Sequence, residues 1–185
     1  MFVLLTANRH YGVMAGQPQD TRAVGRKIRR VQILEVCIVS GHLAKEFIKR
    51  HPALIRTIQI CEDQTLADLH QAIFKAFGRW ENHFYEFQFG KGPYDPKSVR
   101  YVLPSVFEVE DSGESKPAGS VTATTIGALG LRFGQSFGYW FDFGDNWYHQ
   151  INVRSTGLAR KGVRYPRVSS RIGPNPPQYP DEDDS

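Results

Sequence analysis

Histidines and carboxylates gather in two short stretches of this 185-residue chain, and such side chains bind metals or transfer protons in proteins. The first stretch, GRWENHFYEF, contains His83 and Glu86 three residues apart. The second stretch, FDFGDNWYH, contains Asp142, Asp145 and His149. Because histidine with carboxylates suits Zn, Mn or Fe, one hypothesis is a small metal-binding domain or enzyme that uses His83, Asp142, Asp145 and His149.

The same residues also have a structural interpretation. Neither a His-Glu-x-x-His pattern nor closely paired cysteines occur, so the sequence names no metal and no cofactor. Asp145 and Asn146 would cap a hairpin turn. Trp147 would pack in the core, and His149 would bond to a neighbouring strand. His70 falls at the edge of an apolar helix face, which is typical of a core or boundary histidine. The full set of candidate binding residues is His70, His83, Glu86, Asp142, Asp145, Trp147 and His149.

Positive charge is unevenly distributed along the chain, whose formal net charge is +4. Residues 1–30 carry six basic residues against one acid, whereas the last five residues carry four acids. A second basic stretch lies between Asn146 and Pro180, where no acid occurs. Basic clusters can bind phosphates by releasing counterions, although they also occur as ordinary solvated surface. The candidate phosphate contacts are Arg154, Arg160, Lys161, Arg164 and Arg167.

Several apolar or alternating runs predict β-strands. The clearest is Val31–Ser40, which is rich in Val and Ile and almost continuously apolar. This pattern predicts a central strand covered on both faces, in which Glu35 needs a partner or a place at a sheet end. Four further runs predict strands at Leu54–Ile60, Phe84–Phe89, Val99–Leu103 and Val106–Val109.

One helix is strongly marked, over about residues 65–78. Thr65 and Asp68 form a capping-box pattern at its start, and Gly78 follows its end. Between them lies an apolar face that would pack on a sheet, made by Leu66, Leu69, Ile73 and Phe77. A short second helix is expected over about residues 125–129, ended by Gly130.

A β-hairpin is expected over about residues 137–154. Two alternating runs, 137–143 and 147–154, flank the turn-forming triplet Gly144-Asp145-Asn146. Together these elements predict an α+β fold, with a largely antiparallel sheet, one main packed helix, a short second helix and a closing hairpin.

The expected domain covers residues 31–155. Residues 1–30 are expected to form a disordered basic arm, and residues 156–185 an extended proline-rich tail with an acidic end. No run is long and apolar enough for a membrane-spanning helix, and the opening MFVLLTA lacks the features of a signal peptide. Two cysteines are too few for a disulfide framework. We therefore expect a cytoplasmic protein that does not associate with a membrane.

Two stretches of the chain carry a family resemblance. IRTIQICEDQTLADLHQAIFKAFGRWENHFYEFQF and FDFGDNWYHQINV resemble the two hallmark regions of the Ri-plasmid ORF-three-like family. YPRV and PNPP resemble the sequence that follows them, so the resemblance covers roughly residues 31–180. It implies an α+β fold. Relatives are often labelled as passenger proteins of insertion elements or as TnpR-like resolvases, and the family has no settled activity.

The resemblance favours an accessory or binding protein associated with mobile elements, without enzymatic activity. Nucleic acid is the first partner to test, and a protein partner is the alternative. Resolvase activity is not expected, because the one resolvase-like string, YPRVSS, ends at Ser170 and leaves no room for a catalytic domain after it. The runner-up is the metal-binding domain or enzyme described above.

Overall fold

The computed structural model describes residues 28–105 and 116–179. Most of the expected basic arm, the expected strand Val106–Val109 and the acidic end of the chain lie outside these residues. Within them, no helix has the length and apolar character needed to cross a membrane.

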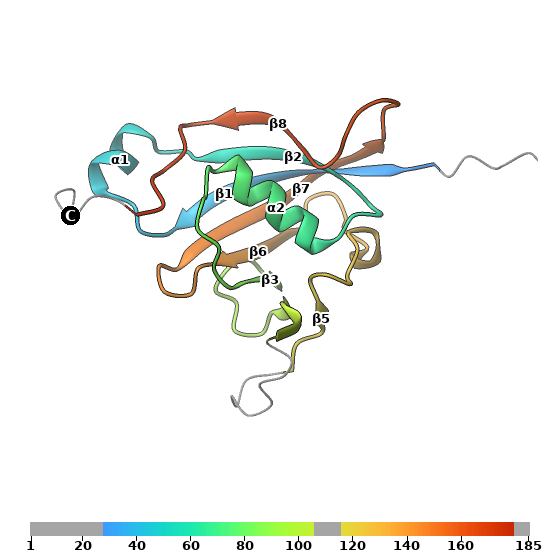
Figure 1. The fold of residues 1–185 in the computed structure, drawn as a ribbon, viewed down its shortest axis with the longest axis horizontal. Coiled ribbons are helices and arrows are strands. Elements are labelled where there is room, and N and C mark those ends of the chain that lie inside the picture. Colours follow the sequence, from blue (N-terminus) through green and yellow to red (C-terminus); the bar gives the residue numbers. More distant parts are fainter. Residues whose placement is uncertain (1–27, 106–115, 180–185) are drawn as a thin grey trace, which may run out of the picture.

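A single sheet of eight strands dominates the described residues (Figure 1). Its strands are β1 (Arg30–Ser40), β2 (Ile55–Cys61), β3 (Tyr85–Phe89), β4 (Val99–Val102), β5 (Gly119–Ser120), β6 (Ser136–Phe141), β7 (Trp147–Leu158) and β8 (Arg167–Ile172). Their order across the sheet is β5-β4-β3-β6-β7-β1-β2-β8. Neighbouring strands are antiparallel except β4 and β5, which are parallel, so the sheet is mixed.

One helix packs across the sheet. Helix α2 (Leu66–Ala76) begins at a capping box, in which the Thr65 side chain accepts from the Asp68 N–H and the Asp68 carboxylate accepts from the Thr65 N–H. Leu66, Leu69 and Ile73 point into the core against the sheet. Figure 1 shows α2 lying over one sheet face. The other helical segments are short, α1 (Lys45–Arg50) and the 3₁₀ turn η2 (Gly127–Leu129).

The expected main helix and closing hairpin are therefore confirmed. The hairpin is longer than expected, because β7 continues to Leu158 along β1. The expected short helix is only a single 3₁₀ turn. The described residues are also richer in β-structure than a balanced α+β fold, since within them eight strands accompany one helix of more than two turns.

The expectation that β1 is covered on both faces is corrected. Leu34 and Val36 are fully buried beneath α2, whereas Glu35 and Cys37, on the opposite face, are only half-buried. Glu35 has the partner that its position requires, because Arg154 on β7 donates to its carboxylate. The continuous apolar run misled the prediction, since Ile and Val also occupy half-exposed positions of an open sheet face.

Residues 156–179 do not form a separate tail. β8 pairs with β2 at the sheet edge, and Arg56 ties the following segment to the core. The fully buried Arg56 guanidinium donates to the carbonyls of Ala76, Ile55, Ile172, Gly173 and Pro174 and to the side chain of Asn175. These bonds satisfy a buried cation without a carboxylate and fix residues 173–179 against α2, as a strap.

Candidate functional site

Of the four residues in the metal hypothesis, the structure brings two together. His83 lies just before β3, and its Nε2 is 3.4 Å from an Asp142 carboxylate oxygen. The Tyr179 hydroxyl from the strap lies 2.8 Å from the same nitrogen and donates to Glu81 at 3.0 Å. The sheet places these residues side by side, because the Asp142 N–H donates to the Phe84 carbonyl across β3 and β6.

Asp142 caps the hairpin turn, a role expected for Asp145 and Asn146. Its carboxylate accepts from the N–H groups of Gly144 and Asp145. Asp142 and Asn146 both have positive φ angles, 57° and 54°, in the left-handed region that Asp and Asn tolerate. The Asp145 side chain is half-exposed on the turn and does not join His83.

His149 forms no ion pair with Asp142, which pairs with His83 instead. It pairs in register with Tyr139, whereas Asp142 lies beyond the last paired residues of the hairpin. His149 is therefore on the buried face, where only 1% of it is exposed. Burial, together with the positive charge of Arg79, lowers the pKa of His149 to about 3. His149 is neutral at physiological pH and belongs to the core, as does Trp147.

Arg79 is a buried cation that senses the charge of Asp142. Its guanidinium stacks on the Trp147 ring at 3.6 Å from the centroid and donates to the Pro177 carbonyl. Its Nε and Nη2 atoms are buried without a hydrogen-bond partner. Burial lowers the pKa of Arg79 to about 10, so the group remains a cation at neutral pH. The sequence gives one indication that Arg79 has a role, which is its position between Gly78 and Trp80 inside the first hallmark stretch.

His70 and Glu86 also have structural partners. His70 stacks on Tyr85 at 3.6 Å between centroids and hydrogen-bonds Tyr139 at 2.7 Å. Burial lowers its pKa to about 4. Glu86, almost fully buried, forms an ion pair with Arg100 at 2.7 Å.

The candidate residues therefore do not converge into a metal-ligand set. In residues 28–105 and 116–179, no group of three or more His, Cys, Asp or Glu side chains is arranged to hold a metal ion. The His83–Asp142 pair supplies two ligands at most. The candidate residues form a His83–Asp142 pair at the end of the hairpin, and Arg79 of the same loop stacks on the buried Trp147 ring.

The basic candidates are exposed on β7, β8 and the loop between them. Arg154 is neutralised by Glu35. In the part of the chain that the structure describes, no ion pair engages the other four, Arg160, Lys161, Arg164 and Arg167.

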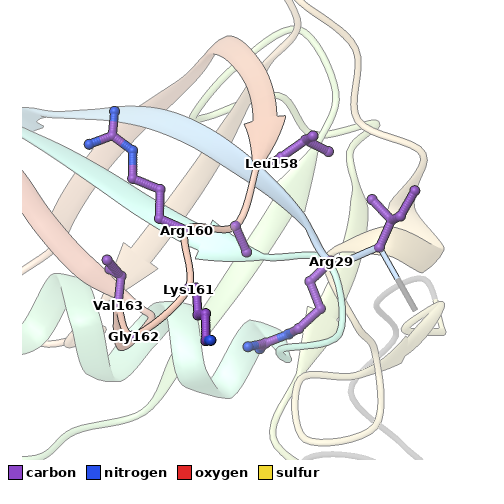
Figure 2. Close-up of a pocket in the computed structure, with 8 residues that line it drawn as sticks. Arg29, Leu158, Arg160, Lys161, Gly162 and Val163 are labelled. Atoms are coloured by element: carbon purple, nitrogen blue, oxygen red, sulfur yellow. The ribbon is translucent and has the colours of Figure 1, made fainter. Parts of the chain in front are cut away.

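A cavity of about 530 Å³ lies where this loop meets the start of β1. It is lined by Ile28, Arg29, Leu158, Ala159, Arg160, Lys161, Gly162 and Val163. Figure 2 shows the head groups of Arg29 and Lys161 pointing toward the same space, whereas the Arg160 side chain extends away from them. Arg29 also forms a two-pronged ion pair with Asp63 at 3.0 and 3.1 Å. Arg29 could not be recognised as a cavity residue from the sequence, because only the fold joins it to Lys161.

The chain belongs to the plasmid pRiA4b ORF-3-like protein family, whose model matches residues 43–179. That range includes both hallmark stretches, β8 and the strap. The family resemblance seen in the sequence is confirmed.

Two similar proteins are also uncharacterised. The protein y4hQ of Sinorhizobium fredii is 28% identical over 127 residues, which cover 69% of this chain and 59% of y4hQ. A crystal structure of MM3350 from Methanosarcina mazei, a protein of unknown function, matches with a TM-score of 0.56 at 22% identity. The match covers 78% of this chain and 70% of that one and indicates a shared fold. The present chain spans about three-fifths of the length of y4hQ, and neither relative supplies an activity.

Proposed function

We propose that this member of the plasmid pRiA4b ORF-3-like family is a non-enzymatic accessory protein that binds the phosphate backbone of nucleic acid. The binding site is the cavity between the start of β1 and the β7–β8 loop. The observation that carries the proposal is the convergence of the Arg29 and Lys161 head groups on this cavity. A phosphate oxygen placed there accepts hydrogen bonds from both cations.

The surrounding charge supports a polyanionic partner. Residues 147–179 contain no acid, so the loop and both of its strands offer cations only. Arg160, Arg164 and Arg167 are exposed around the cavity loop and extend the positive surface beyond one phosphate. A row of cations suits successive phosphates of one strand, and it binds them by counterion release.

Asp63 is expected to lower the affinity of this site for phosphate. Its carboxylate holds Arg29 and raises the pKa of that guanidinium through a hydrogen bond. A bound phosphate therefore shares Arg29 with a carboxylate, which lowers affinity without removing the cation. Modest affinity and little base readout suit an accessory protein that contacts many sequences. By its family, such a protein would act alongside plasmids or other mobile elements.

The test is fluorescence anisotropy of the full chain with labelled duplex and single-stranded DNA at low salt. Lys161→Glu places a negative charge in the cavity and is expected to weaken binding at least about tenfold. Lys49→Glu makes the same charge change on the exposed face of α1, at the opposite end of the sheet, and serves as the matched control. Equal weakening by both variants would mean that only net charge matters, and the proposal would fail.

The metal or enzyme alternative is not proposed, because no observation favours it. His149 faces the core and Asp142 is committed to its turn, which leaves His83 without the further ligands that the hypothesis required.

A further inference from the structure

The far end of the molecule carries an exposed aromatic surface. Four aromatic side chains of the α2–β3 loop, the β6–β7 turn and the strap reach solvent there. They are Trp80 (69% exposed), Phe84 (56%), Phe143 (37%) and Tyr179 (39%). Exposed apolar side chains that gather in one place on a monomeric protein often mark an interaction surface. We call these four residues the end patch.

Ring contacts group the four residues of the end patch into two pairs. The Trp80 and Tyr179 rings meet edge to face at 5.7 Å, and the Phe84 and Phe143 rings stack at 6.4 Å. His83 hydrogen-bonds Tyr179 and directly precedes Phe84 in the chain. The four rings therefore form two contacting pairs, linked along the chain by His83, rather than four scattered residues.

The charges within this surface are mainly negative. The exposed Glu81 carboxylate accepts only from the Tyr179 hydroxyl, and the half-exposed Asp145 has no ion-pair partner among the described residues. Arg79, the cation next to Trp80 in the chain, is buried against Trp147. A partner at the end patch thus meets aromatic rings and carboxylates together.

The end patch is separate from the basic cavity. The two lie near opposite ends of β7, Trp147–Leu158, which at 3.3 Å per residue are about 36 Å apart. Figure 1 shows the β6–β7 turn and the end of β7 on opposite sides of the sheet. Carboxylates repel phosphates, so the end patch does not extend the nucleic-acid site.

We infer that the end patch binds an arginine- or lysine-rich segment of a partner protein. Cationic side chains would lie against the Trp80, Phe84 and Phe143 rings through cation–π contacts. The carboxylates of Glu81 and Asp145 would pair with the same or neighbouring cations. Charge complementarity selects this partner over a purely apolar segment, because an apolar segment would cover both carboxylates without pairing them.

The test is fluorescence anisotropy of the full chain with a labelled peptide of alternating arginine and glycine. Peptides of equal length that replace arginine with glutamate or with leucine are the competing probes. Trp80→Ala is expected to raise the peptide Kd about two- to fivefold, the range of an exposed cation–π contact, and Trp80→Phe is expected to retain most of the binding. Glu81→Gln is also expected to weaken binding. The loss of affinity should be larger at low salt, because the attraction between the carboxylate and the peptide cations is screened less there.

Phe133→Ala provides the matched control. Phe133 is 81% exposed, more than any end-patch residue, and makes no ring contact within the described residues. It is expected to leave the peptide Kd unchanged. The inference is overturned if the arginine peptide does not bind, if Phe133→Ala weakens it as much as Trp80→Ala, or if the leucine or glutamate peptide binds equally well.

Discussion

Two buried histidines predict that acid destabilises this fold well above the pH at which carboxylates titrate. His70 and His149 are 4% and 1% exposed, and their pKa values are lowered to about 4 and about 3. In the unfolded chain both return to an ordinary pKa near 6.5. Below pH 6.5 the unfolded state therefore binds more protons than the folded state does. The free energy of unfolding decreases as the pH is lowered.

The magnitude follows from the pKa values. At pH 5, protonation of one unfolded histidine favours unfolding by about 2 kcal/mol, while the folded side chain is still almost wholly neutral. Two such residues cost about 4 kcal/mol between pH 7.5 and pH 5, a large share of the roughly 5–15 kcal/mol available to a domain. The loss begins near pH 6.5. It levels off for His70 near pH 4 and continues for His149 toward pH 3.

Urea unfolding at pH 7.5 and pH 5.0 measures this loss. His70→Phe keeps an aromatic ring against Tyr85 but removes the titrating group. The pH-dependent loss should then shrink by about 2 kcal/mol, whatever the variant costs at pH 7.5. A His70→Phe variant with the same pH dependence as the natural chain would refute the reasoning.

Two further predictions concern local structure. Thr65→Ala removes the acceptor for the Asp68 N–H, and its free energy of unfolding should fall by about 1 kcal/mol; an unchanged urea midpoint would contradict the capping role. Gly41→Ala places a Cβ atom 2.2 Å from the Trp147 ring, where φ is also positive at 156°, so thermal unfolding should show a loss of about 1–3 kcal/mol. A neutral Gly41→Ala substitution would mean that Trp147 is not held against this turn.

The elements that could be predicted from the sequence are those marked by patterns between neighbouring residues. The Thr65–Asp68 capping pattern marked α2 because its bonds join residues three apart. The alternation around Gly144 marked the β6–β7 hairpin for the same reason. β8 escaped prediction because it pairs with β2, more than a hundred residues earlier, and because Gly, Pro and Arg around it look like a tail. Arg56 holds the end of β8 and the residues after it through hydrogen bonds to residues 172–175. These bonds join residues far apart in the sequence, so no local sequence pattern indicates them.

The candidate site was predictable only in part. Residue type and spacing selected His83 and Asp142, and the sheet does bring them together. They gave no information on which side chains would meet, so the buried His149 was grouped with His83 and Asp142, although only those two pair with each other. Lys161 was recognised as basic, but its partner Arg29 belongs to the other end of the sequence. Joining them required the pairing of β1 with β7.

The salt dependence of DNA binding tests the central proposal most directly. Anisotropy titrations of the full chain across a salt series give the slope of log K against log salt. A phosphate site at this cavity should give a linear fall for the natural chain, a slope shallower by about one unit for Lys161→Gln, and an unchanged slope for Lys49→Gln. The same slope in all three proteins, or no DNA binding at low salt, would contradict a phosphate site at the Arg29–Lys161 cavity.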